Sequence, residues 1–285
     1  MYYALIMLSV VMFSGCFALK ENYGKRQGSG IKQSMVFLLI SSVAGLVVMV
    51  IFGGFKLSYT HFTGIMALLS SLNALGFTLC SFKALNTINL SVFSLYSMLG
   101  GMLLPFLQGV IFYGEELTVA KVLCLLFIAA SLILTIQKGT GKGGAIYYTG
   151  VFILNGMSGV ISKIFASAPY PKTNAAGFMI LSTIFNALIA AVIILILNKT
   201  KTNKQTPVTI TLGALSGSLN RIANYILVFA LTFVDASVQY PLVTGGTIIV
   251  STVICFIRGV KPSKKELASV VLAFLGMVIL FAFPV

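Results

Sequence analysis

Charged residues are scarce in this chain. Asp, Glu, Lys and Arg together make up 8% of its 285 residues, and only five of those residues are acidic. Hydrophobic residues make up 58%, and the mean hydropathy is +1.05. So little polar surface cannot cover a soluble globular protein, which excludes that class. The sequence therefore predicts a protein that lies in a lipid bilayer.

Other absences bear on chemistry. The four cysteines each stand alone in an apolar segment, and the single histidine, His61, has no metal-ligating partner nearby. This spacing argues against disulfides and metal sites. The zinc-protease HExxH, the serine-hydrolase GxSxG and the Walker-type nucleotide motif are also missing from the sequence. We therefore expect no cofactor, no ATP site and no enzymatic activity.

What the chain does contain is a series of long apolar segments. Each has about the length, roughly 20 residues, that an α-helix needs to cross the hydrocarbon core of a bilayer. The segments are 2–19, 33–54, 62–82, 89–112, 119–136, 145–166, 174–197, 208–231, 236–257 and 266–283. The links between them are too short for a soluble domain, so we predict an all-α membrane protein with ten transmembrane helices.

The chain carries the same membrane unit twice. The string Ser71-Leu72-Asn73 recurs 147 positions later as Ser218-Leu219-Asn220, each time midway through an apolar segment. Further matches are Ala84-Leu85 with Ala230-Leu231, and Tyr96-Ser97-Met98-Leu99-Gly100-Gly101 with Tyr240-Pro241-Leu242-Val243-Thr244-Gly245-Gly246. Each unit holds five spans, and an odd number inserts the second unit upside down relative to the first. We predict two inverted five-helix repeats, 1–138 and 145–285, joined by a Gly-rich linker at 139–144.

Basic residues gather in alternate links. In a soluble protein a net charge of +14 would suggest nucleic acid as a partner, but here the bases are spread among short loops, and we expect none. The odd-numbered links hold Lys20, Lys25, Arg26, Lys32, Lys83, Lys138, Lys142, Lys199, Lys201, Lys204, Arg258, Lys261, Lys264 and Lys265. By the positive-inside rule these links are cytoplasmic and both termini lie outside. The two units have opposite charge bias, which also favours inversion.

One block of sequence resembles a known family. It runs from Ala84-Leu85 to Leu99-Gly100-Gly101-Met102-Leu103-Leu104-Pro105 and continues with Gly114-Glu115-Glu116-Leu117-Thr118 and a small-residue helix. With the helix count and the duplication, it resembles the ten-helix EamA-type members of the drug/metabolite transporter superfamily over the whole chain. The resemblance implies alternating access between two halves, with substrate near the midplane and the fifth and tenth helices at the periphery. The second repeat has Arg258-Gly259-Val260-Lys261-Pro262-Ser263 in place of the glutamate link, so no symmetric role for the acid is implied.

Arg221 is the most informative single residue. It lies near the centre of the eighth span, where an isolated charge costs from about 2.5 to over 10 kcal/mol, so it should face a partner or a wet cavity. The acidic residues all fall at or near span ends. Arg221 either anchors an anionic or carboxylate-bearing substrate through its bidentate fork, or is held structurally by carbonyls or by Asn73 and Asn155.

Four asparagines are further candidates. Asn73 and Asn220 are repeat mates, Asn224 lies one turn beyond Asn220, and Asn155 is central in the sixth span. An amide in a membrane must form hydrogen bonds. These residues therefore either join helices to one another or line a substrate cavity.

Tyr96, Tyr240 and Lys83 complete the candidate substrate-binding residues. The tyrosines are repeat mates beside glycine pairs and either contact substrate or simply pack. Lys83 ends the third span, where it either extends to the interface or adds positive potential at a cavity mouth.

The sequence favours a secondary, ATP-independent transporter in the cytoplasmic (inner) membrane. Its substrate would be a small polar metabolite, with an amino acid or organic anion favoured because the buried charge is positive. The alternative is a component that binds or flips lipid head groups, or a non-transporting partner subunit. Besides the lipid bilayer and the small-molecule substrate, the sequence indicates no partner, and it leaves open whether the protein is a monomer or a homodimer.

Overall fold

The computed structural model of the chain describes residues 2–53, 59–114, 118–135, 142–197, 204–230, 233–234 and 236–282. The regular structure in these residues consists of ten α-helices, and each overlaps one predicted apolar segment. They are α1 (Tyr2–Gln27), α2 (Ile31–Gly53), α3 (His61–Leu85), α4 (Leu90–Tyr113), α5 (Val119–Thr135), α6 (Lys142–Ser167), α7 (Ala175–Ile196), α8 (Pro207–Ala230), α9 (Ala236–Ile257) and α10 (Lys264–Ala282). The predicted all-α fold is confirmed.

Several helices have the length and composition of membrane spans. Six of them, α1, α2, α3, α4, α6 and α7, are long and apolar enough to cross a bilayer. Shorter apolar stretches lie in α5 and α9. These helices indicate a multi-pass membrane protein. The acidic link Glu115–Glu116 and residues 139–141 of the predicted linker lie outside the described residues.

Polar residues in the links determine where several helices begin. The side chains of Thr60, Asn89 and Asn174 accept hydrogen bonds from the first backbone amides of α3, α4 and α7. At the start of α10, Ser263 and Glu266 accept from each other's backbone amides. Such caps satisfy N–H groups that have no partner within the helix. Hydropathy thus produces the spans, and these polar residues fix their starts.

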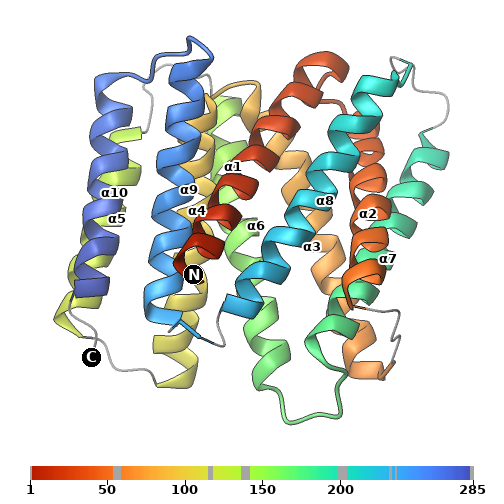
Figure 1. Ribbon diagram of the computed structural model, residues 1–285, viewed down its shortest axis with the longest axis horizontal. Helices are drawn as coiled ribbons and strands as arrows, with labels where there is room; N and C mark the ends of the chain where they lie inside the picture. The colour runs from red at the N-terminus through yellow and green to blue at the C-terminus, as the bar shows by residue number, and fades with distance from the viewer. Residues whose placement is uncertain are drawn as a thin grey trace.

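Eight helices form a closed ring in which each packs against the next. The order around the ring is α1, α8, α2, α7, α3, α6, α4, α9 and back to α1. The ring is flattened into two layers, with α9, α1 and α8 in front of α4, α6 and α3 (Figure 1). The helices α2 and α7 join the layers at one edge, while α5 and α10 pair outside the ring at the other edge (Figure 1). We call the region between the two layers, into which side chains of both layers point, the ring interior.

Glycines allow neighbouring helices of the ring to come very close. A methyl group on Gly100 of α4 would collide with the backbone carbonyl of Phe152 on α6. A methyl group on Gly217 of α8 would collide in the same way with the backbone of Ser41 on α2. Small residues are typical of helix contacts in membranes, where close approach supplies the packing energy. These glycines therefore fix the spacing of the ring.

The two layers meet at the end of the molecule that carries the links 28–30, 86–89, 204–206 and 258–263. We call this the basic end. Across the ring, α1 packs there against α3 and α4, and α2 packs against α3. The rings of Tyr23 of α1, Phe37 of α2 and Phe82 of α3 form one buried cluster. In the described residues α6 has no comparable packing against α8 or α9, so the layers are joined mainly at the basic end.

The first helix is longer than its predicted span. We predicted an end at residue 19, but α1 continues to Gln27, so Lys20 and Glu21 lie inside it and are buried. Glu21 forms ion pairs with Lys25, at 2.6 Å, and with Arg258, at 2.8 Å. The Arg258 pair links α1 to the end of α9. This neutralisation by two cations explains how the carboxylate tolerates burial.

Substitution of Gly100 tests the close packing. Gly100→Ala should destabilise the detergent-solubilised protein by about 1–3 kcal/mol, because the opposing backbone carbonyl cannot move aside as a side chain can. Gly76→Ala is the matched control, since its methyl group would meet only the mobile Leu154 side chain at 3.3 Å. Thermal unfolding of both variants provides the comparison. Equal loss of stability in the two would contradict the argument.

Candidate functional site

One face of α8 looks into the ring interior. The exposed side chains of Leu215, Tyr225 and Phe229 mark the outer face of this helix. At about 100° per residue, Asn220 is turned roughly 140° from both Leu215 and Tyr225. Asn220 and Asn224, one turn later, therefore lie on the inner side of α8.

Arg221 reaches from α8 across the inner side of α2 to α7. Its Nη2 donates a hydrogen bond to Oγ1 of Thr183, at 2.7 Å, and Thr183 is fully buried. Its side chain lies over Gly45 of α2, where a Cβ would come within 2.9 Å of the arginine Cγ. Because α2 stands between α7 and α8 in the ring, this contact bridges two helices that are not ring neighbours. A glycine at position 45 leaves the space that the arginine needs.

The described residues place no carboxylate beside Arg221. Of the acidic residues, Glu21 and Glu266 belong to the described part of the chain. Glu21 is paired with Lys25 and Arg258, and Glu266 caps α10 outside the ring. The described hydrogen-bond partner of this half-buried guanidinium is a neutral hydroxyl, so its charge and most of its donors are available to another ligand. This arrangement suits an anion.

Asn73 and Asn155 join helices. Nδ2 of Asn73 on α3 donates to the Leu154 carbonyl oxygen and to Ser158 Oγ on α6, both at 2.8 Å. Nδ2 of Asn155 on α6 donates to the Ser97 carbonyl oxygen on α4 at 2.6 Å. The structure therefore brings these two candidates together on one stretch of α6. Their contacts support the helix-joining interpretation.

Asn220 and Asn224 form a local pair. Nδ2 of Asn224 donates to the Asn220 carbonyl oxygen at 2.7 Å and to the Asn220 Oδ1 at 3.3 Å. Both bonds stay within α8, so neither ties this helix to a neighbour. The pair lies on the inner side of α8, about 100° around the helix from Arg221, and both side chains are half-buried. They are available to a ligand in a way that Asn73 and Asn155 are not.

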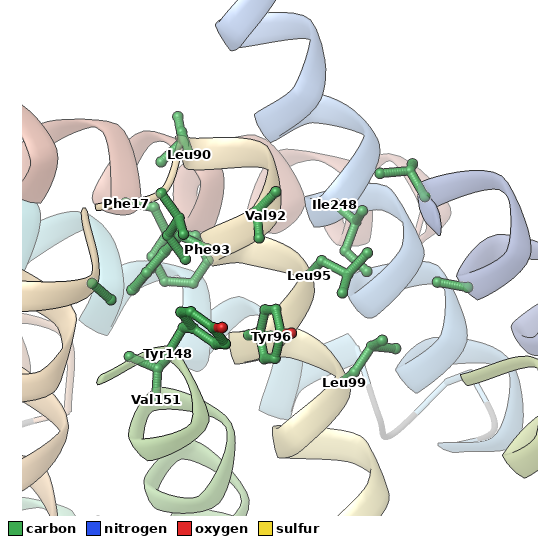
Figure 2. Packing of buried hydrophobic residues seen from close by; sticks show 14 of the residues in the cluster. Phe17, Leu90, Val92, Phe93, Leu95, Tyr96, Leu99, Tyr148, Val151 and Ile248 are labelled. Carbon is green, nitrogen blue, oxygen red and sulfur yellow. The ribbon is translucent and has the colours of Figure 1, made fainter. Parts of the chain in front are cut away.

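The tyrosines and Lys83 lie elsewhere. Tyr96 of α4 is buried against Tyr148 of α6, with ring centroids 4.8 Å apart, inside a large apolar cluster (Figure 2). The side chain of its repeat mate Tyr240 lies outside the described residues. Lys83 is half-buried near the end of α3. The structure thus gives Tyr96 a packing role and brings neither Tyr96 nor Lys83 into contact with Arg221.

Sequence reasoning missed Lys20. We assigned it to a link, but it is 9% exposed, and its Nζ lies 4.7 Å from the ring centroid of Phe77 and 5.8 Å from that of Phe37. These rings belong to α3 and α2, so the lysine points across the ring interior. The available signal was the series Phe13, Phe17 and Lys20, whose spacing of four and three residues places them on one helical face.

Comparison with known proteins shows the fold alone. No family model and no curated protein matches the chain. A solved structure described only as "Crystal structure of protein" has a similar fold, with a TM-score of 0.58 and 18% sequence identity. The match covers 96% of this chain and 94% of the other. The arrangement of helices over the whole chain is therefore one that a solved protein shares.

Asn155 forms a hydrogen bond between helices and Asn224 forms hydrogen bonds within one helix, and the stability of their alanine variants tests this difference. Asn155→Ala removes a hydrogen bond between helices and should lower the stability of the protein by about 0.6–1.7 kcal/mol, which spans the average and the maximum measured for such bonds within one membrane protein. Asn224→Ala removes only bonds within α8 and should have a smaller effect. Thermal unfolding in detergent measures both. A larger loss for Asn224→Ala would contradict the assigned roles.

Proposed function

We propose that the protein is an ATP-independent carrier of a small organic anion, working by alternating access in the cytoplasmic membrane. The observation that carries the proposal is Arg221, a half-buried cation that bridges α8 and α7 with no described carboxylate beside it. The sequence resemblance to EamA-type members of the drug/metabolite transporter superfamily supports the same function. The substrate path in this proposal is the ring interior.

The helix packing supports a pair of inverted repeats in the proposed carrier. Exchanging α1–α5 with α6–α10 turns the contact of α1 with α8 into that of α6 with α3. In the same way, α4 with α6 becomes α9 with α1, and α2 with α8 becomes α7 with α3. All of these contacts are present, so the exchange maps the ring onto itself.

The same exchange suggests how access would alternate. It turns the contact of α1 with α3 into one of α6 with α8, and that of α1 with α4 into one of α6 with α9. The contacts of α1 with α3 and with α4 are made at the basic end. In the described residues α6 has no comparable packing against α8 or α9. In the proposed cycle a second state forms the missing contacts and loses the present ones. In this proposal the basic end is cytoplasmic, and the present contacts correspond to the state that would be open to the outside.

The lipid-binding alternative is less well supported. It requires Arg221 to point to a groove on the lipid side. The arginine instead bonds to Thr183, which is fully buried, and packs over Gly45 on the inner side of α2. A group bound by this guanidinium would lie inside the ring.

Transport by proteoliposomes tests the carrier. The purified protein should take up at least one radiolabelled organic anion from a panel of pyruvate, succinate and glycerol 3-phosphate. Arg221→Gln should lower that uptake by about tenfold or more, equivalent to about 1.4 kcal/mol of lost stabilisation. Arg221→Lys should retain part of it, because the charge remains without the bidentate fork.

Controls separate charge from fold. Lys261→Gln removes an exposed basic residue in a link and should leave uptake unchanged. Thermal unfolding verifies that the Arg221 variants are folded. Unchanged uptake in Arg221→Gln would eliminate the anchoring role, and a wild-type protein that transports none of the anions would contradict the carrier.

A further inference from the structure

We propose that Lys20 is a second anion-binding residue, which receives the substrate's acidic group from Arg221 on the way to the basic end. The proposed substrate is a carboxylate or phosphate without a positively charged group. This inference rests on the proposed carrier function and specifies its path and substrate class.

The ammonium group of Lys20 is buried without a counter-ion in the described part of the chain. It has no hydrogen bond or ion pair there and is held instead over the rings of Phe77 and Phe37. The adjacent Glu21 is already paired with Lys25 and Arg258. A cation–π contact stabilises an ammonium but does not neutralise it. All three N–H donors of Lys20 therefore remain available to an acceptor.

Lys20 lies at the point where the ring interior closes. Gly24, one turn further along α1, packs against Phe82, and Phe82 belongs to the aromatic cluster with Tyr23 and Phe37. Phe37 contacts both this cluster and the lysine. An anion that moves through the ring interior to the basic end would meet Lys20 immediately before this cluster.

The depths of the two cations can be compared because α1 and α8 pack side by side. Ser9 bonds to the carbonyl oxygen of Ala223, and Cys16 bonds to that of Ser216. The two helices run in opposite directions, and both bonds fit one alignment in which residue n of α1 lies beside residue 232 − n of α8. In this alignment the backbone of Arg221 lies at the depth of position 11 of α1. Lys20 is nine residues further along, or about 13 Å at 1.5 Å per residue. The backbone positions of the two cations therefore differ in depth by more than two helical turns, and in the proposed path one acidic group binds to them in succession.

The charges of the interior also limit the substrate. Arg221 and Lys20 are both positive, and the described residues provide no unpaired carboxylate for an ammonium group. An amino acid would bring its own cation into this positive region without a counter-ion, which is costly in a membrane. A simple carboxylate or phosphate meets no such penalty.

The decisive experiment separates binding from translocation. Equilibrium binding of the radiolabelled panel anion that wild type transports is measured by scintillation proximity in nanodiscs, and its uptake is measured in proteoliposomes. Lys20→Gln should change the Kd less than threefold yet slow uptake about tenfold or more. Arg221→Gln should lose binding itself. Lys20→Arg should restore uptake at least in part, because it keeps the charge.

Arg26→Gln is the matched control, since Arg26 lies on the same helix, is exposed, and is not one of the two cations that neutralise Glu21. Wild-type uptake by Lys20→Gln would overturn the second site and leave the carrier intact. So would equal failure of Lys20→Gln and Lys20→Arg with loss of thermal stability, since that pattern indicates a structural role. Uptake of zwitterionic alanine in preference to pyruvate would overturn the substrate class. A wild-type protein that transports nothing in the panel would overturn the carrier and this inference together.

Discussion

A charged side chain inside a bilayer must be accommodated by the protein itself, and this constraint accounts for much of the structure. Lipid supplies neither counter-ions nor hydrogen bonds, so each buried charge needs a local solution. Glu21 is neutralised by Lys25 and Arg258. Arg221 occupies the space over Gly45 and bonds to Thr183, and Lys20 lies against phenylalanine rings. The last two solutions shield the charge without cancelling it, and both lie inside the ring.

Hydropathy predicted the helices well, because a membrane span is determined by local composition. Each predicted segment overlaps one helix, but the end of α1 was wrong by eight residues. The segment was ended where the charges begin, yet Lys20 and Glu21 continue the helix because other helices cover them. Burial of this kind depends on tertiary packing, which composition alone does not contain. The same error hid Lys20 as a candidate.

The partners of the polar residues were also beyond sequence reasoning. Asn73 was expected to bond to something, but its partners on α6 lie more than eighty positions away in the chain. Tyr96 was a candidate for substrate contact in the sequence, whereas in the structure it packs in an apolar cluster. Arg221 itself was found readily, because a basic residue in an apolar segment is visible without any knowledge of the fold. Nothing in the sequence marked Thr183 as its hydrogen-bond partner.

In the proposed carrier, the scarcity of acidic residues is itself functional. A carboxylate beside Lys20 would bind the ammonium more strongly than aromatic rings do, and a substrate anion would then have to displace it. Aromatic rings hold the cation in place while leaving its hydrogen-bond donors free. Phe37 contacts both Lys20 and the aromatic cluster that joins the layers. Movement of the lysine toward an anion would therefore alter the packing at the very contact that keeps the basic end closed, which couples substrate binding to opening through adjacent side chains.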